Sequence, residues 1–170
     1  MNAMECILSR TSVRSFQDRE VEDELIAELL KAGMSAPSAV NMQPWMFVVV
    51  TRREMLDSLS RKLPYAKMLS QAPRAVVVCG DLRKTLDQRE REYWIEDCSA
   101  AAQNILLAAH ANGLGAVWTA VYPVAERVDS VLSILDLPEY LIPLNVIPVG
   151  YPAEIREPVD KWDQDKVLWK

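Results

Sequence analysis

The hydrophobic pattern along the chain predicts helices and strands in alternation. Apolar residues at helical spacing, together with helix-end signals, predict five helices. These cover residues 2–9, 22–33, 53–61, 93–112 and 123–135. The fourth is the longest and is apolar almost all round, which is typical of a central helix that is covered on several sides.

Four short apolar runs rich in β-branched residues predict strands. They cover residues 47–51, 75–79, 116–121 and 142–149, and we expect Pro143 and Pro148 to limit the last one. Prolines also mark residues 34–44 as a loop, and Pro64 and Pro73 bracket a short turn or helix.

The tail from residue 152 to residue 170 is polar until it ends in Val167, Leu168 and Trp169. An apolar end after a polar stretch needs a surface to cover it. That surface is either the body of the same chain or a partner chain, and the tail alone does not decide between them.

Size and charge narrow the class of protein. A length of 170 residues and a mass of 19.2 kDa predict a single domain over residues 1–170. The formal net charge of −5, with no basic stripe, argues against a nucleic-acid partner. The longest apolar runs are far too short to span a bilayer, so we expect no membrane partner. No signal peptide is evident, and three distant cysteines favour reduced thiols and a cytoplasmic location: Cys6, Cys79 and Cys98.

Few residues offer chemistry of their own. The five glycines form no GxGxxG, GxxxxGK[ST] or GxSxG motif, which excludes a Rossmann turn, a P-loop and a nucleophile elbow. For the one histidine, His110, a structural role near a helix end is favoured over metal binding. Cys79 and Cys98 are interpreted as small core residues, and Glu96 and Asp97 as acidic residues that favour the start of their helix. We therefore expect a bound cofactor to carry any reaction.

Three polar clusters are candidates for holding that cofactor. The first is residues 10–15, in which Arg10 and Arg14 lie four positions apart with hydroxyl residues between and beside them. This set of hydrogen-bond donors is suited to a phosphate or a ribityl chain. In the second, residues 37–45, the amides of Asn41 and Gln43 match the N–H and C=O edges of a flat heterocycle. In the third, residues 113–123, small residues permit a close approach of backbone amides to a ring. The alternatives are an exposed basic turn, a capped turn, and a helix end with a plain core strand.

In this order the clusters resemble the nitroreductase family, flavin-dependent reductases that bind FMN at a dimer interface. The matching pieces are RTSVRSF at 10–16, SAPSAVNMQPWMFVVV at 35–50, AAQNILLAAHANGLGAVW at 101–118, VIPVGYPAE at 146–154 and DKWDQDKVLW at 160–169. The resemblance covers nearly the whole chain and implies a compact member. The implied fold is an α+β sandwich, with a mostly antiparallel central sheet flanked by helices, in an intertwined homodimer. The long helix would be buried in the dimer, and the C-terminal segment would cross to the partner.

The resemblance also implies which residues bind the cofactor. The phosphate, ribityl chain and pyrimidine edge of FMN would be held by Arg10, Thr11, Ser12 and Arg14, with Arg14 at the N1–C2=O edge, where its charge favours reduced flavin. The other subunit would contribute Pro37, Ser38, Ala39 and Asn41. The ring would be lined by Trp118, Thr119 and Ala120.

The tail departs from the family pattern. Members often carry Lys-x-Arg after the GYP turn, and the matching positions here are Val159 and Lys161. Lys161 would still contact the phosphate, but one cation is lost and FMN affinity is expected to be weaker unless Arg156 compensates.

The implied activity is reduction of nitroaromatics, quinones or similar electron-poor acceptors by NADH or NADPH. The two substrates would react in turn with FMN, in a ping-pong sequence that needs no catalytic side chain and no metal. Two alternatives stay open. One is a specialised relative, either a reductive dehalogenase or an enzyme that consumes its flavin, and the other is a flavin-binding protein without turnover. Segments 61–72 and 81–93 are expected to be lids, and their residues do not identify the acceptor.

Overall fold

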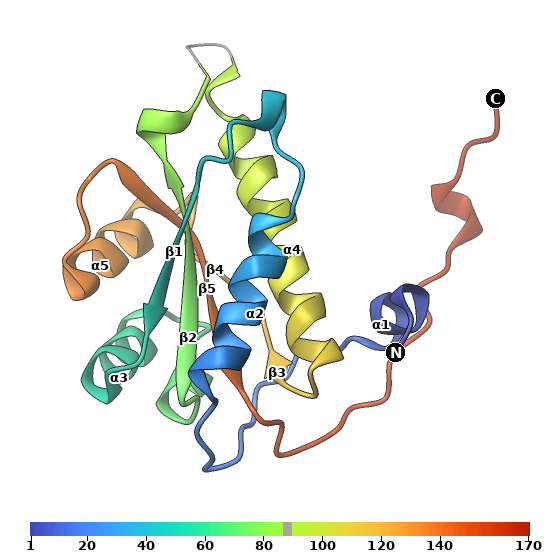
Figure 1. Ribbon diagram of the computed structural model, residues 1–170, viewed down its shortest axis with the longest axis horizontal. Helices are drawn as coiled ribbons and strands as arrows, with labels where there is room; N and C mark the ends of the chain where they lie inside the picture. The colour runs from blue at the N-terminus through green and yellow to red at the C-terminus, as the bar shows by residue number, and fades with distance from the viewer. Residues whose placement is uncertain (87–89) are drawn as a thin grey trace.

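A central antiparallel sheet organises the structure, a computed structural model that describes residues 1–86 and 90–170. The strand order is β1–β2–β5–β3, and β4 also pairs with β5. All strand pairs between described residues are antiparallel. Helices cover both faces of the sheet (Figure 1), so the expected α+β sandwich with an antiparallel sheet is confirmed.

The strands lie close to their predicted positions: β1 Trp45–Val50, β2 Arg74–Asp81, β3 Gly115–Ala116, β4 Thr119–Ala120 and β5 Leu141–Gly150. The prediction of one strand over 116–121 is wrong, because two short strands occupy this stretch. Both keep one register against β5, in which residue 117 falls opposite Pro148. Since proline has no N–H, it cannot complete the ladder there. Pro143 and Pro148 were expected to limit the last strand but lie inside it.

The five predicted helices are confirmed: α1 Ala3–Ser9, α2 Asp23–Met34, α3 Arg53–Lys62, α4 Tyr93–Ala111 and α5 Ala125–Leu135. Short 3-10 helices occupy connections and the tail: η1 Ala39–Asn41, η2 Lys67–Ser70, η3 Leu82–Lys84 and η5 Gln164–Lys166. Helices α2 and α4 cover one face of the sheet, and α3 and α5 cover the other (Figure 1). Within the described ranges no helix has the length and apolar character needed to cross a bilayer.

Alternate residues of β2 enter two different cores. Val76 and Val78 pack with α2 and α4, whereas Ala75 and Val77 pack with α3 and α5. All four are fully buried. A central strand buried on both faces has a continuous apolar sequence, as this one has.

Helix α4 is central, as its sequence predicts. Ala101, Ala102 and Ile105 are fully buried between α2 and the sheet. Small side chains on this helix permit close packing, so its two ends are held at fixed places in the molecule.

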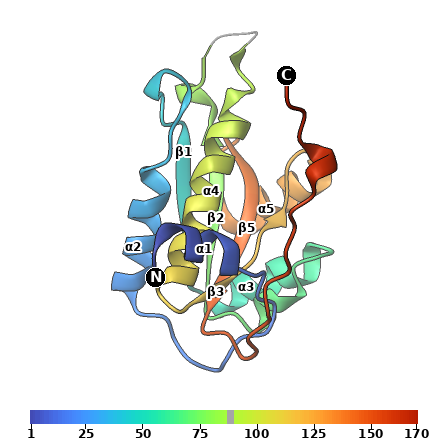
Figure 2. The same ribbon diagram turned by 90° about the vertical axis from the view of Figure 1, so that its right-hand side faces the viewer.

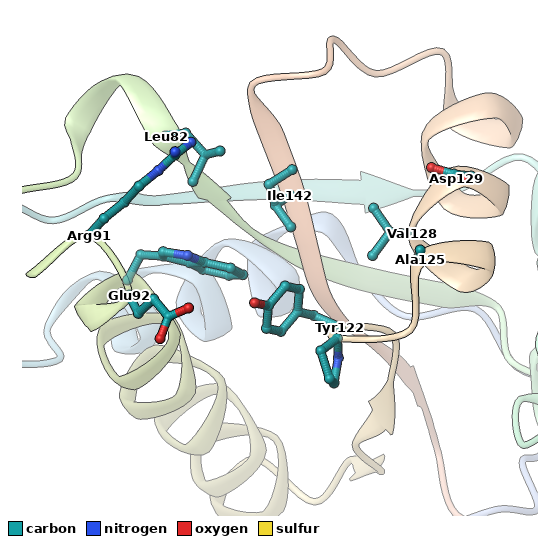
Figure 3. A pocket seen from close by; sticks show the side chains of 10 residues that line it. Leu82, Arg91, Glu92, Tyr122, Ala125, Val128, Asp129 and Ile142 are labelled. Atoms are coloured by element: carbon teal, nitrogen blue, oxygen red, sulfur yellow. The ribbon is translucent and has the colours of Figure 1, made fainter. Parts of the chain in front are cut away.

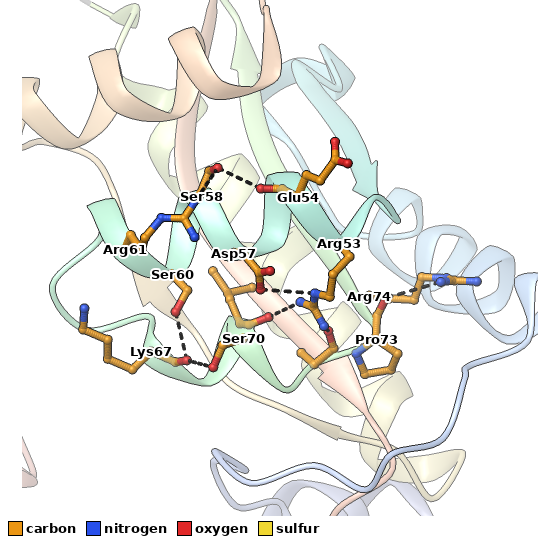
Figure 4. Close-up of polar contacts among 12 residues, drawn as sticks. Arg53, Glu54, Asp57, Ser58, Ser60, Arg61, Lys67, Ser70, Pro73 and Arg74 are labelled. Carbon is orange, nitrogen blue, oxygen red and sulfur yellow. Dashed lines mark hydrogen bonds and ion pairs between the residues drawn. The ribbon is translucent and has the colours of Figure 1, made fainter.

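The segment 61–72 belongs to the second core, and its prediction as a lid is wrong. Leu63, Ala66 and Leu69 are buried in that core. The Arg53 guanidinium, anchored by Asp57 at 3.2 Å, donates to backbone carbonyls of the segment (Figure 4).

The other expected lid, residues 81–93, is described only in part. It begins with η3 and ends in the first turn of α4, and residues 87–89 lie outside the described residues.

Two apolar surfaces are not covered within this chain. Helix α1 presents Met4, Ile7 and Leu8, which are 62%, 51% and 68% exposed. In the tail Leu168 and Trp169 are 82% and 90% exposed, and the final residues run away from the sheet and helices (Figures 1 and 2). These end residues of the tail are therefore not covered by the described part of their own chain.

Candidate functional site

The first cluster follows α1, and two contacts fix its position. Before it, Ser9 Oγ lies 2.7 Å from His110 Nε2 at the last turn of α4. Within it, the Val13 N–H donates to the Ala116 carbonyl at 3.1 Å, which places the segment beside β3. Neither Arg10 nor Arg14 forms a salt bridge with any described residue. Two arginines without acidic partners make this segment suited to an anion.

Gly115 makes room for the arginine segment beside β3. A Cβ at this position would lie 2.6 Å from Val13 Cγ1. The missing side chain thus lets the arginine segment lie directly against β3, so Gly115 makes room for Val13 in this chain.

The third cluster continues along the same edge of the sheet. Thr119 is buried and pairs with Val146 of β5, and its Oγ1 also donates to the Val146 carbonyl. Trp118 is half-buried and Ala120 is exposed. The structure thus brings the first and third clusters to neighbouring positions along β3 and β4.

The second cluster, residues 37–45, contains a strained loop before β1. Val40, Asn41 and Gln43 have positive φ angles of 42°, 60° and 50°, which are uncommon for residues other than glycine. The loop is held by its own polar groups, because Ser38 Oγ accepts from the Gln43 N–H at 2.9 Å and Asn41 Oδ1 accepts from Gln43 Nε2 at 2.9 Å. Strain of this kind concentrates at functional sites, where the surrounding structure maintains it.

Asp97 fixes this loop to the first turns of α4. Its Oδ1 accepts from the Ala39 N–H at 2.9 Å. Burial raises the pKa of Asp97, and the hydrogen bond opposes that shift. The sequence assigned Asp97 only to the helix dipole, and its contact with the loop was missed because it joins positions 58 residues apart.

The two anchored clusters lie at opposite ends of α4. Ala39 is held by Asp97 near one end, and Ser9 contacts His110 at the other. At about 1.5 Å per residue these two anchor points are roughly 20 Å apart along the helix. One copy of the chain therefore does not bring the second cluster to the arginine segment.

No hydrogen bond or salt bridge between described residues joins Lys161 or Val159 to the arginine segment. Both are in the tail, and Val159 is 75% exposed. The last backbone hydrogen bond that joins the described tail to the body is donated by the Ala153 N–H to the Ser15 carbonyl.

The remaining candidates are the cysteines and His110. Burial raises the pKa of the Cys79 thiol to about 12 and also raises that of Cys98, so neither is a ready nucleophile. Burial lowers the pKa of His110, and the charge of Arg10 lowers it further. In the described part of the chain no cluster of ligands suits a metal ion.

A cavity of about 390 Å³ opens between the starts of α4 and α5 (Figure 3). Trp94 and Tyr122 form an edge-to-face pair in its wall, with ring centroids 5.1 Å apart. Val128 and Ile142 add apolar surface, and Arg91 is among the charged residues that line it. An apolar cavity with a few charges suits a flat organic molecule. Sequence analysis missed it because its walls come from separate elements.

Comparison with known proteins identifies the family. The model of the nitroreductase family matches residues 7–64 and 56–151. The chain belongs to the nitroreductase family. A relative from Methanothermobacter thermautotrophicus, whose name combines NADH dehydrogenase and NAD(P)H nitroreductase, is 47% identical over 98% of this chain and 86% of its own.

Solved structures of nitroreductases have the same fold. A protein from Bacteroides thetaiotaomicron with the same combined name is 50% identical, with a TM-score of 0.93 over 99% of this chain and 98% of its own. An FMN-dependent nitroreductase from Clostridium difficile is 31% identical, with a TM-score of 0.89 over 98% of both chains.

Replacing Asp97 with asparagine tests the buried anchor. Asp97→Asn keeps an oxygen that accepts from Ala39 and removes the charge. The pKa of Asp97 is higher in the folded protein than in the unfolded chain. The ionised carboxylate therefore destabilises the folded protein at pH values above the folded-state pKa, and this effect is absent below the unfolded value, near 3.8. We expect the variant to melt roughly 2–4 °C above the parent at pH 7.5, and this gain to vanish as the pH falls toward 4.

Thermal unfolding followed by circular dichroism at several pH values measures this effect. Glu28→Gln, at an exposed position of α2, is the control and should show no such gain. A D97N protein that melts below the parent at every pH would contradict the account.

Proposed function

We propose that this chain is an FMN-dependent oxidoreductase that uses NADH or NADPH to reduce nitroaromatics, quinones or similar electron-poor acceptors by a ping-pong mechanism. The observation that carries the proposal is the pair Arg10 and Arg14, free of acidic partners and held against the β3–β4 edge in a member of this family. The FMN dependence of the Clostridium difficile relative supports it.

The donor set of the first and third clusters fits FMN. Arg10 supplies a planar, permanently charged fork for the phosphate, and the half-buried Thr11 and Ser12 supply hydroxyls for the phosphate and ribityl chain. Arg14 is exposed beside them and is assigned to the pyrimidine edge. Trp118, Thr119 and Ala120 line the ring, and the Thr119 hydroxyl is already bonded to the Val146 carbonyl.

The rest of the site comes from a second copy of the chain in a homodimer. Pro37, Ser38, Ala39 and Asn41 of one subunit face the arginine segment of the other, because within one chain α4 holds them apart. The exposed apolar residues of α1 and the tail are the surfaces that the second copy covers. Lys161 adds a point charge for the phosphate. Val159 occupies the position at which many family members carry the other cation, so that charge is missing here.

The protein's part in the reaction is binding and electrostatics. Bound FMN would supply the redox chemistry between NADH or NADPH and the acceptor. Arg14 holds a fixed positive charge where negative charge develops on reduction, and this favours the reduced state. The buried thiols take no part in the reaction.

The spectrum of the purified protein tests the proposed function. We expect a yellow protein with flavin absorbance, or uptake of added FMN, and loss of the visible band when NADH or NADPH is added without oxygen. A nitroaromatic or quinone should restore the band. A protein that stays colourless with FMN contradicts cofactor binding, and a band that NAD(P)H does not bleach leaves a flavin-binding protein without turnover.

Arg14→Ala tests the pyrimidine-edge assignment. Charge-assisted hydrogen bonds contribute about 1.5–3 kcal/mol, so FMN affinity should fall roughly 10- to 100-fold. Reduction of the bound flavin should also slow, measured by stopped-flow absorbance. Arg61→Ala on α3 is the matched control, because it removes an exposed arginine on the opposite face of the sheet. Unchanged flavin content and unchanged reduction rate in R14A would refute the assignment.

A further inference from the structure

His110 and Ser9 form a directed hydrogen bond between the last turns of α4 and α1. Ser9 Oγ lies 2.7 Å from His110 Nε2 and 2.6 Å from the Glu5 carbonyl oxygen. A serine hydroxyl has one proton, and a carbonyl oxygen only accepts. Ser9 therefore donates to Glu5 and accepts from His110, so the arrangement assigns the ring proton to Nε2.

This bond is one of few polar ties between α1 and the body of the protein. The helix has seven residues, too few to be stable alone in water, and only Cys6 is buried. The Cys6 thiol lies 3.3 Å from the Leu107 carbonyl, so the second tie also runs to the end of α4. The face of α1 that bears Met4, Ile7 and Leu8 is exposed and gives no anchor within the chain.

Arg10 depends directly on the position of this last turn. Its N–H donates to the Cys6 carbonyl at 3.1 Å and so ends the helix. Ser9, its neighbour in the chain, carries the hydroxyl that His110 holds. The Arg10 charge lies close enough to His110 to lower the pKa of the imidazole, which keeps the ring neutral beside the arginine.

We propose that His110 is a positioning residue for cofactor binding, acting through Ser9 to hold Arg10 where it meets the phosphate of FMN. This rests on the proposed function, in which Arg10 contacts that phosphate. A neutral imidazole suits the task, because it donates a hydrogen bond and adds no charge that competes with Arg10 for the anion. The sequence showed only a histidine near a helix end, since its partner lies 101 positions away.

The test compares FMN with riboflavin, which lacks the phosphate. Affinities for both ligands are measured by flavin fluorescence titration of the full-length protein and of the variants H110L, H110Q, S9A and R10A. Asn112→Ala, which removes an exposed amide at the end of α4, is the matched control.

We expect His110→Leu and Ser9→Ala each to weaken FMN binding roughly fivefold, the value of one neutral hydrogen bond, and to leave riboflavin binding unchanged. The double variant should be no weaker than either single one, because both remove the same bond. His110→Gln should restore FMN affinity, because its amide also donates. Arg10→Ala should remove most of the preference for FMN.

The outcomes separate the two proposals. If the parent binds FMN no better than riboflavin, or if R10A keeps the preference, the phosphate assignment of Arg10 fails and this inference fails with it. If R10A loses the preference while H110L and S9A keep it in full, Arg10 stands and His110 has no positioning role. Equal weakening of both flavins in H110L and S9A also overturns the inference, because it shows general loss of structure. If H110L does not fold, S9A and H110Q decide.

Discussion

The rigid length of α4 is the constraint on which the candidate site depends. The helix is packed between α2 and the sheet, and each of its ends contacts one of the two polar segments of the candidate site. Asp97 fixes the strained loop at one end, and His110 contacts the turn before the arginine segment at the other. Because a buried helix does not shorten, a single copy cannot close these halves around one ligand, and a second copy becomes a requirement of the proposed chemistry.

The division of the proposed site between two copies also explains why the chain has exposed apolar surfaces. An exposed apolar face on a seven-residue helix and a tail that ends in exposed Leu168 and Trp169 are costly in an isolated subunit. In the proposed dimer these surfaces gain cover at the place where the cofactor is bound. Assembly and cofactor binding then depend on each other, which is consistent with a chain that has few catalytic groups of its own.

Much of the fold follows from local sequence pattern, and much of the site does not. Helical spacing located all five helices, and the β-branched runs located the strands, because burial of one face or of both leaves a direct periodic signal. The split between β3 and β4 was missed because it depends on Pro148 of another strand. The ties from Asp97 to Ala39 and from His110 to Ser9 are contacts between distant positions, and they leave no local pattern. The arginine segment was found from its residue types, and the family resemblance added the roles that geometry in one chain does not supply.

Complementation between two defective subunits tests the two-chain site most directly. One variant carries Arg14→Ala, and the other carries Ser38→Ala and Asn41→Ala in the loop. Each alone should retain little FMN. After subunit exchange of an equal mixture, about half of the dimers are mixed, and each mixed dimer has one site free of both changes. The account predicts that about a quarter of all sites regain FMN, measured by absorbance after removal of free flavin. No recovery, with exchange verified by differently tagged subunits, would contradict it.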